Sequence, residues 1–358
     1  MAGPTLKIED QIDDERARDF CDEFINSIER PKYLFGRNIY ADKITKLIDI
    51  KGFIDDYSDE AEFLGKPIVR LEQVPKSALV LILSGGKPLS AEKRVKGQGL
   101  ECLDYFAFYR YSGLPLEPVR FMAGFAKDLK ENRSKYEWIY GILRDEVSKE
   151  QFYKLVNFKL HYDLNYLRGF KCLEHKQYFE PFLGLKEEGE VFADVGGYDG
   201  YTSREFIRLY PKYRSVHLFE PEAKNISVAR DKLKKYKNIN FYQLGLSNEK
   251  ETLHFDVQSS NSKICEDGNT LIEADKLDDV IHERITFMKV DVEGAESRVI
   301  DGAKETIRKC RPKLAVCAYH QVCDFWKIPE QIFSIRADYD LYLRHYTESI
   351  YETVMFFL

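Results

Sequence analysis

The sequence has 358 residues, of which 44% are apolar and 32% are charged, and its net charge at pH 7 is −6. This composition is typical of a folded globular protein, and the length predicts two domains, each with its own core. Because the net charge is negative and the basic residues are interspersed with acids, we expect neither a nucleic-acid partner nor binding to anionic lipid.

The first 90 residues predict an α/β module preceded by a helix. Apolar residues at helical spacing indicate an amphipathic helix over 13–28, which ends before Pro31. Three apolar runs then predict strands, and a helical pattern through Ile44 separates the first two. The strands are expected at 32–38 with a terminal glycine turn, at 51–56 with acids at the end, and at 78–83. This alternation is typical of a parallel sheet.

Three short motifs occur in this module: Phe35-Gly36-Arg37-Asn38, Gly52-Phe53-Ile54-Asp55-Asp56 and Gly65-Lys66-Pro67-Ile68. With these motifs the segment resembles the small Rossmann-like module that is often fused to surface-polysaccharide enzymes. Asn38 stands where the first turn of that module usually has its second glycine, so the backbone cannot approach a phosphate closely. We therefore favour a docking role or a homo-oligomer interface for this domain over ligand binding.

Residues 91–188 predict a helical connector that is rich in aromatic residues and mixed charge. Helix-like runs lie at 100–111, 118–129, 136–143 and 149–165. Three aromatic residues near the end of the connector are expected to pack on the entrance of the next domain: Tyr178, Phe179 and Phe182. His161 and His175 also lie in this region, and we interpret both as ordinary histidines without a catalytic role.

The stretch Val191 to Ser203, VFADVGGYDGYTS, predicts a strand, a glycine turn and a helix. Its apolar start indicates a short buried strand. The Gly196-Gly197 pair and Gly200 then allow the backbone to turn sharply and to approach a ligand closely. Thr202 or Ser203 is expected to cap the helix that follows.

A second strand at 215–219 ends on Glu220, where a doubly wound sheet presents a carboxylate to the hydroxyls of a ribose. The glycine turn lacks the third glycine of the dinucleotide fingerprint, and it carries Asp194 and Asp199. Two carboxylates would repel a pyrophosphate, but they would attract the sulfonium and ammonium groups of S-adenosylmethionine. The charge of the turn therefore favours S-adenosylmethionine over NAD.

The next elements continue the same sheet. A helix is expected at 223–236 and a third strand at 239–244, followed by the loop Gly245-Leu246-Ser247-Asn248. This loop borders the predicted ligand crevice, so its backbone and the Ser247 hydroxyl are candidates to hold the edge of an adenine. A plain turn is the alternative interpretation.

Two later strands deliver polar residues to the same edge of the sheet. A strand at 284–290 leads into Asp291-Val292-Glu293-Gly294-Ala295-Glu296, and a strand at 313–318 leads into Tyr319-His320. Asp291 follows the strand that lies next to the glycine turn, and that position faces the reacting centre of such folds. The tail, at 340–344 and 353–357, alternates like a terminal antiparallel hairpin.

Motifs of one family occur in order from Val191 to the C-terminus. They are Asp194-Val195-Gly196-Gly197-Tyr198-Asp199-Gly200, Thr202-Ser203, Phe219-Glu220-Pro221, Leu277-Asp278, Lys289-Val290-Asp291-Val292-Glu293-Gly294-Ala295-Glu296, Asp301-Gly302-Ala303, Pro312, Tyr319-His320 and Arg344-His345-Tyr346. This part of the chain resembles the FkbM family of S-adenosylmethionine-dependent O-methyltransferases. The resemblance implies the seven-stranded class I methyltransferase fold and methyl transfer to a hydroxyl of a sugar, nucleotide sugar or glycan intermediate of polysaccharide biosynthesis. Family members usually have Ala-Asn in place of Gly197-Tyr198, so Tyr198 is expected to change the contact with the methionine end.

The predicted site divides into cofactor-binding and catalytic residues. Cofactor contacts are predicted for Asp194, Gly196, Gly197, Tyr198, Asp199, Ser203, Glu220, Pro221, Leu246, Ser247 and Asp291. Methyl transfer also needs an aligned acceptor and a group that removes a proton. The catalytic candidates are His320, whose ordinary pKa lies near neutral, Asp291, as a second base or as a group that orients His320, and Glu293.

A metal ion is an alternative at the same place. Asp291, Glu293 and Glu296 offer the carboxylate oxygens that suit Mg²⁺. The two glutamates can equally cap and solvate the start of a helix, so we do not favour the metal.

Together these patterns predict an α/β protein with four segments: an N-terminal helix in 1–30, a smaller Rossmann-like module in 31–90, a helical connector in 91–188 and the methyltransferase domain in 189–358. Two other functions stay open, an NAD-dependent sugar dehydrogenase or epimerase, and a non-catalytic scaffold with a degenerate methyltransferase domain. No apolar run approaches the ~20 residues of a membrane span. The seven scattered cysteines lack a C-x2-C pair, so we expect a cytoplasmic protein without disulfides or structural zinc.

Overall fold

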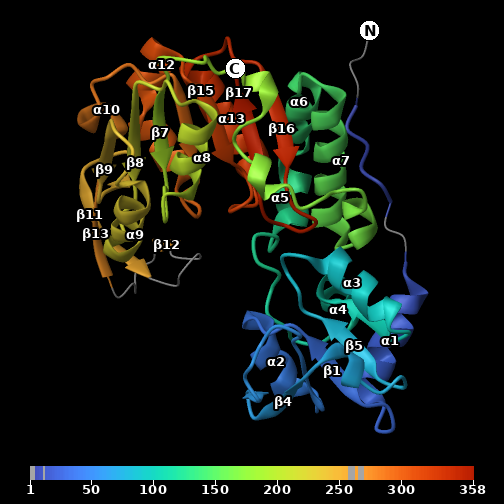
Figure 1. Ribbon diagram of the computed structural model, residues 1–358. Helices are drawn as coiled ribbons and strands as arrows, with labels where there is room; N and C mark the ends of the chain where they lie inside the picture. Colours follow the sequence, from blue (N-terminus) through green and yellow to red (C-terminus); the bar gives the residue numbers. More distant parts are fainter. Residues whose placement is uncertain (1–4, 11–12, 257–262, 265–269) are drawn as a thin grey trace.

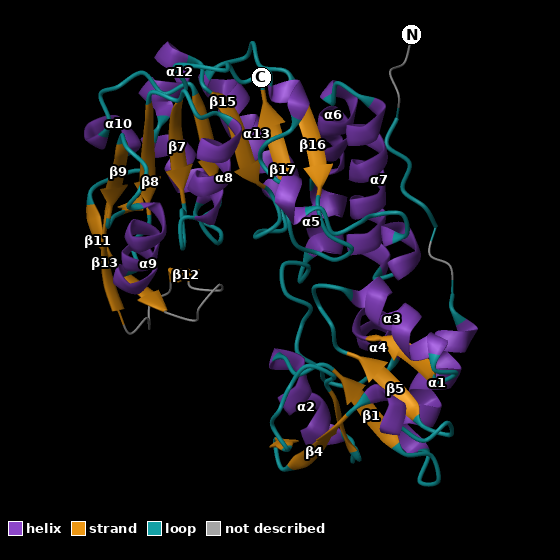
Figure 2. Ribbon diagram, viewed as in Figure 1, coloured by secondary structure: helices purple, strands orange, loops and turns teal. Residues whose placement is uncertain are grey.

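Two α/β domains with a helical segment between them make up the structure (Figure 1). The computed structural model describes residues 5–10, 13–256, 263–264 and 270–358. The strands gather in two separate groups at opposite ends of the molecule, and helices lie between them (Figure 2). None of the helices in the described ranges is both long and apolar enough to cross a membrane. Six cysteines in these ranges are free thiols, and Cys265 lies outside them.

The N-terminal domain is built on a six-stranded sheet with the order β3-β4-β2-β1-β5-β6. Its strands are β1 (Lys32–Phe35), β2 (Gly52–Ile54), β3 (Glu62–Phe63), β4 (Lys66–Val69), β5 (Leu79–Ile82) and β6 (Glu101–Asp104). Its helices are α1 (Glu15–Asn26), α2 (Ile39–Leu47) and α3 (Pro88–Gly97). All pairs are parallel except β3 with β4, which confirms the predicted parallel sheet.

This sheet extends beyond residue 90, where the sequence predicted its end. The predicted helix over 100–111 is wrong in its first part, because β6 pairs there with β5 and only then does α4 (Tyr105–Tyr111) begin. The Asp104 carboxylate explains the change from strand to helix, since it accepts a hydrogen bond from the Ala107 N–H at 3.0 Å and so caps α4.

The connector consists of α4, α5 (Phe125–Glu131), α6 (Arg133–Ile142) and α7 (Glu146–His161), followed by three short 3-10 helices up to Leu183. Helices α6 and α7 confirm two predicted helical runs. The predicted helix over 118–129 is helical only from Phe125 onward, because Phe121 and Gly124 have the positive φ angles 61° and 85°. Helix α7 contacts β16 (Leu341–His345) and so joins the connector to the C-terminal domain.

The C-terminal domain is built on a seven-stranded sheet with the order β16-β17-β15-β14-β7-β8-β9. Its other strands are β7 (Val191–Val195), β8 (Ser215–Phe219), β9 (Ile239–Tyr242), β14 (Phe287–Val290), β15 (Lys313–Cys317) and β17 (Thr353–Phe357). Strand β17 runs antiparallel to β15 and β16, which confirms the predicted terminal hairpin. The order of connections reverses between β7 and β14, and an open parallel sheet has its ligand crevice at such a point.

Helices α8 (Tyr201–Leu209), α9 (Ala223–Leu233), α10 (Leu277–Val280), α11 (Glu296–Gly302), α12 (Lys304–Cys310) and α13 (Asp324–Ile335) complete this domain. A small second sheet was not predicted. Its strands are β10 (Gly245–Leu246), β11 (Glu251–Asp256), β12 (Lys263–Ile264) and β13 (Thr270–Asp275), in the order β10-β13-β11-β12. Gly302 lets β10 pack against α11, because a Cβ atom there would lie 1.9 Å from the Ser247 carbonyl oxygen.

The loop between β16 and β17 docks on the N-terminal domain. The Glu348 carboxylate accepts hydrogen bonds from the Ser90 N–H at 2.6 Å and from the Ser90 hydroxyl at 3.0 Å, in the first turn of α3. The Ser349 hydroxyl donates to the Gly85 carbonyl oxygen after β5. Glu348 therefore occupies the helix N-terminus where a ligand-binding module of this type would hold a phosphate. These contacts agree with a docking role, and the homo-oligomer stays a prediction.

Candidate functional site

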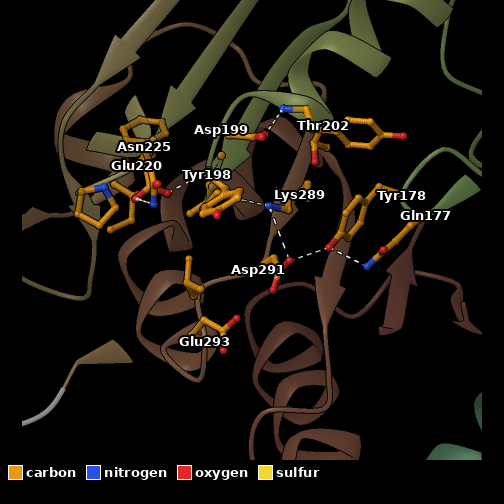
Figure 3. Close-up of a pocket in the computed structure, with 18 of the residues that line it drawn as sticks. Gln177, Tyr178, Tyr198, Asp199, Thr202, Glu220, Asn225, Lys289, Asp291 and Glu293 are labelled. Atoms are coloured by element: carbon orange, nitrogen blue, oxygen red, sulfur yellow. Dashed lines mark hydrogen bonds and ion pairs between the residues drawn. The ribbon is translucent and has the colours of Figure 1, made fainter. Parts of the chain in front are cut away.

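A cavity of about 410 Å³ lies at the carboxyl ends of β7, β8 and β14 (Figure 3). Its walls come from the turns after these three strands, from the segment around β10 and from the end of the connector. The lining residues include Glu174, His175, Gln177, Tyr178, Gly196, Gly197, Tyr198, Asp199, Glu220, Pro221, Leu246, Lys289, Asp291, Glu293 and Glu352. The cavity thus lies at the reversal point of the sheet, where the sequence predicted the ligand.

The turn after β7 requires glycine at two successive positions. A Cβ atom on Gly196 would lie 1.8 Å from the Asp291 carbonyl oxygen, and one on Gly197 would lie 2.5 Å from Cγ of Leu218. The turn can therefore pack closely against the ends of β14 and β8 only without side chains. Helix α8 then begins with Gly200 as its N-cap, so the predicted caps Thr202 and Ser203 are wrong.

Glu220 is held at the cavity wall by the backbone. Its Oε2 accepts a hydrogen bond from the Tyr198 N–H at 3.0 Å, and its Oε1 accepts one from the Glu222 N–H at 3.0 Å. Burial raises the pKa of this carboxyl group, while these hydrogen bonds act in the opposite direction. Glu220 is therefore a fixed acceptor at the end of β8, the position predicted to receive ribose hydroxyls.

A buried lysine neutralises much of the acidic turn. Lys289 is 2% exposed, and its Nζ donates to the Gly196 carbonyl oxygen and lies 3.4 Å from Asp194 Oδ1 and 4.0 Å from Asp291 Oδ2. Burial alone would lower its pKa, but the two aspartates outweigh burial and raise it. Lys289 therefore carries a positive charge beneath the turn. This role was not predicted from the sequence, although a lysine inside an otherwise apolar strand that ends in Asp291 is a visible signal.

The connector closes one side of the cavity through Gln177 and Tyr178. The Tyr178 hydroxyl donates to Asp291 Oδ2 at 2.8 Å, and the Gln177 amide donates to the Tyr178 hydroxyl at 2.8 Å and to Glu352. Figure 3 shows this series of contacts running from Lys289 through Asp291 and Tyr178 to Gln177. Burial raises the pKa of Tyr178 well above its ordinary value, so its hydroxyl stays a donor.

His320 lies behind two carboxylates of the cavity wall. Its Nδ1 lies 2.8 Å from Glu296 Oε1, and its Nε2 lies 3.6 Å from Glu293 Oε2 and 3.8 Å from Asp291 Oδ1. Burial alone would lower the pKa of His320, but Glu296, Asp291 and Glu293 outweigh burial and raise it to about 10. The predicted base is thus buried away from the lining and holds a proton at neutral pH when no other cation takes its place.

Comparison with known proteins shows what this domain is similar to. Residues 194–349 match the family described as the methyltransferase FkbM domain. This segment is therefore similar to the methyltransferase FkbM domain, and we call it the FkbM domain below. The 2-O-methyltransferase NoeI of Sinorhizobium fredii is 26% identical to this chain, in an alignment that covers 36% of this chain and 63% of NoeI.

The fold of the whole chain has a solved counterpart. A crystal structure of methyltransferase FkbM from Methylobacillus flagellatus KT matches with a TM-score of 0.76 and 22% sequence identity. The match covers 96% of this chain and 94% of that chain, so the N-terminal domain and the connector belong to the shared fold. The predicted class I methyltransferase fold is thereby confirmed, and the match of residues 194–349 agrees with the predicted resemblance to the FkbM family.

Several predicted site residues lie on the cavity of the FkbM domain and others do not. Tyr198, Asp199, Pro221, Leu246, Asp291 and Glu293 line it together with the two glycines and Glu220. Three residues predicted to contact the cofactor do not line the cavity, because their side chains are buried behind the wall: Asp194, Ser203 and Ser247. The Ser203 hydroxyl donates to Asp194 at 2.7 Å, and the Ser247 hydroxyl donates to Glu251 at 2.6 Å. Asp199 forms an ion pair with Lys232, so its charge is also compensated.

Strained backbone is concentrated at the cavity of the FkbM domain. Nine described residues other than glycine have a positive φ, and four of them line the cavity. These four are Tyr178 (70°), Tyr198 (45°), Glu293 (54°) and Glu352 (64°). Such conformations persist where surrounding contacts impose them, and they are frequent at ligand sites. Sequence patterns for helix and strand do not reveal this feature.

Two parts of the FkbM domain have the chemistry to hold a cofactor or a metal. The glycine turn with Glu220 offers a close backbone approach and one fixed carboxylate. At the other end, ligand atoms of Asp291, Glu296 and His320 all lie within 4.8 Å of one another, a spacing that an ion could bridge. His175, interpreted as an ordinary histidine, also lines the cavity.

Proposed function

We propose that the protein is an S-adenosylmethionine-dependent O-methyltransferase that acts on a hydroxyl of a sugar, a nucleotide sugar or a glycan intermediate. The observation that carries the proposal is the cavity of the FkbM domain, which joins a glycine turn and a fixed carboxylate at one end to a carboxylate pair at the other. The match to that domain gives methyl transfer. It leaves the dehydrogenase and scaffold hypotheses without a supporting feature in the described residues.

The cofactor is expected to lie along the glycine turn. Glu220 accepts the two ribose hydroxyls, and Pro221 with Leu246 forms the apolar wall beside the adenine. The methionine end passes Tyr198 toward Asp291. Because Asp194 and Asp199 are paired with lysines, attraction of the positive cofactor depends on the carboxylates that stay on the cavity surface.

The acceptor hydroxyl is expected at the end of the cavity formed by Asp291 and Glu293. A sulfonium methyl group is already activated, so the enzyme has to align the acceptor oxygen behind it and provide for the loss of a proton. Asp291 is oriented for this by Tyr178, and His320 lies directly behind both carboxylates. We propose these three residues as the catalytic end, with the carboxylates in contact with the acceptor and His320 supporting them.

The acceptor class rests on one relative of the C-terminal domain and on the sequence resemblance of the N-terminal domain. NoeI is named as a 2-O-methyltransferase, which supports oxygen as the methyl acceptor. The N-terminal domain resembles modules fused to surface-polysaccharide enzymes, which supports a sugar or glycan.

Binding of S-adenosylhomocysteine, the stable product of the cofactor, tests the cofactor assignment. Isothermal titration of the full chain should show one site per chain, and NAD should produce no heat. The Glu220→Gln variant should bind more weakly, whereas Glu249→Gln, on the surface, should bind like the wild type. A chain that binds NAD, or that binds neither compound, would contradict the proposal. Mass analysis of products formed from candidate sugars then identifies the acceptor.

A further inference from the structure

Three ligand-type atoms converge at the acceptor end of the cavity without a hydrogen bond between them. His320 Nε2 lies 3.6 Å from Glu293 Oε2 and 3.8 Å from Asp291 Oδ1, and it has no hydrogen-bond partner among the described residues. Hydrogen bonds between such atoms measure ~2.7–3.2 Å. His320 is 4% exposed, so water does not satisfy this nitrogen freely. A buried nitrogen without a hydrogen bond that faces two carboxylates at this distance leaves room for a cation that would replace the proton on His320.

Outer hydrogen bonds fix the orientation of two of these groups. Glu296 Oε1 lies 2.8 Å from His320 Nδ1 and also accepts the Val292 N–H at 3.0 Å. With the proton on Nδ1, the lone pair of Nε2 points toward Asp291 and Glu293. The Tyr178 hydroxyl occupies Oδ2 of Asp291 and leaves Oδ1 on the His320 side. Metal-binding histidines characteristically donate their second N–H to a carboxylate in this way.

The distances from His320 Nε2 to Asp291 Oδ1 and to Glu293 Oε2 suit a shared ion. Two ligands at about 2.1 Å from one metal are about 3.0 to 4.2 Å apart in octahedral geometry, depending on whether they are adjacent or opposite. The two distances from Nε2, 3.6 and 3.8 Å, fall within this range. Asp291 and Glu293 line the cavity, so an ion can enter from that side (Figure 3).

We propose that His320 Nε2, Asp291 Oδ1 and Glu293 Oε2 bind a divalent first-row transition-metal ion, with Glu296 as the residue that orients His320. One imidazole and two carboxylates form a mixed nitrogen and oxygen donor set, which suits Mn²⁺, Fe²⁺ or Zn²⁺ better than an all-oxygen Mg²⁺ site. This donor set differs from the three carboxylates that the sequence suggested for Mg²⁺, because His320 replaces Glu296 as a direct ligand.

The ion would act on the acceptor hydroxyl, and this role rests on the proposed function. The binding of the ion to the three residues does not rest on it. Asp291 and Glu293 line the cavity, so an acceptor hydroxyl could reach an ion held by these residues. An ion held there would lower the pKa of the acceptor hydroxyl, so that its proton would pass to water more readily. The acceptor oxygen then takes the methyl group as the carbon–sulfur bond breaks, and the electron pair stays on sulfur to give S-adenosylhomocysteine.

Titration with Mn²⁺ tests the site directly. The full chain is treated with a chelator, and bound Mn²⁺ is measured from the loss of the free-ion electron paramagnetic resonance signal. We expect one Mn²⁺ per chain, and at least about tenfold weaker binding in Glu293→Gln and Glu296→Gln. Glu174→Gln is the matched control, because it removes the same charge from the same cavity and Glu174 is not one of the proposed ligands. It should bind Mn²⁺ like the wild type.

His320→Ala should abolish the binding, and S-adenosylhomocysteine affinity shows whether that variant is folded. If His320→Ala fails to fold, the Mn²⁺ affinity of Glu293→Gln tests the site instead, since this substitution keeps the shape of a partly exposed side chain. A wild-type chain that does not bind Mn²⁺, or a Glu293→Gln variant that binds it equally well, overturns the site. Mn²⁺ binding without S-adenosylhomocysteine binding would instead reject the proposed function and leave the metal site standing.

Discussion

The two mainly parallel sheets of this protein reverse their connections beside the first strand of each domain, but their strand ends differ. In the C-terminal domain the turn after β7 opens onto a cavity of about 410 Å³. In the N-terminal domain the corresponding groups contact one another. Asn38 caps α2 by accepting the Tyr40 N–H at 3.1 Å, and Arg37 pairs with Asp55 at 2.9 Å. Glu348 occupies the N-terminus of α3.

The comparison shows that the topology of a sheet supplies a place for a ligand, and the residues at the strand ends decide whether the place stays free. Both second strands end in an acid, Glu220 after β8 and Asp55 after β2. Glu220 is held by backbone N–H groups at the cavity wall, whereas Asp55 is bound by a guanidinium of its own chain. Substitutions at paired positions of the two domains can therefore test the difference.

The largest difference is expected between the two glycine turns. Gly196→Ala should lower the free energy of unfolding by more than about 4 kcal/mol, because its Cβ would lie 1.8 Å from a backbone oxygen at a φ of 76°. Gly36 has a φ of 101°, but the atom nearest to a Cβ built on it would be 3.6 Å away. Gly36→Ala should therefore lower the free energy of unfolding by only about 1 to 2 kcal/mol, through backbone strain. Urea unfolding measures both values, and equal losses would show that close packing of the turn is unimportant.

The next difference concerns the cations beside the strand ends. Lys289→Met should lower the free energy of unfolding by about 3 kcal/mol, because it leaves Asp194 buried without its partner. Arg37→Met should lower it by about 1 kcal/mol or less, since the Arg37 and Asp55 side chains are both partly exposed. If Lys289→Met unfolds at the same urea concentration as the wild type, the burial of Asp194 does not depend on the positive charge of Lys289.

A smaller difference is expected for ligand affinity at the paired acids. Glu220→Gln should weaken S-adenosylhomocysteine binding about tenfold, because one neutral amide oxygen replaces a charged acceptor of ribose hydroxyls. Asp55→Asn should leave that affinity unchanged, since Asp55 belongs to the N-terminal sheet. Isothermal titration measures both, and an equal effect of the two substitutions would remove the distinction between the two strand ends.

The sequence predicted the backbone of the site better than its side chains. The glycine turn, Glu220 and Asp291 follow from local patterns, because they stand at strand ends where topology alone brings them together. Ser203 also stands near a strand end, but the rotation of α8 directs its hydroxyl to Asp194, and that rotation is set by packing. Likewise the pairing of Lys289 with Asp194 joins two strands far apart in the chain, so no local pattern contains it.

The unpredicted elements have the same explanation. Strand β6 pairs with β5. Its short sequence before Asp104 is also compatible with a helix, so pairing with β5, and not the local sequence, makes it a strand. The small sheet formed by β10, β11, β12 and β13 likewise depends on pairing between separate segments. The docking of Glu348 on Ser90 joins positions that are 258 residues apart.

The smallest effect is expected where the hairpin loop meets α3. Glu348→Gln keeps the shape of the side chain but removes its charge, so the two hydrogen bonds from Ser90 lose the contribution of an ionised acceptor. The melting temperature should fall by a few degrees, which corresponds to about 1 kcal/mol. Affinity for S-adenosylhomocysteine should not change, because Glu348 lies outside the cavity lining.

Ser90→Ala is the matched variant from the other side of this contact. It removes one of the two hydrogen bonds and should lower the melting temperature by less than Glu348→Gln. The double variant should lower the melting temperature by less than the sum of the two single decreases, since both changes affect one contact.

A titration of Glu348→Gln with phosphate tests the same helix end. If phosphate raises the melting temperature of this variant and not that of the wild type, the N-terminal domain holds a latent anion site that the chain fills with its own carboxylate. If phosphate affects neither, the loop is a structural clamp, and the two sheets differ in more than the occupant of one helix end.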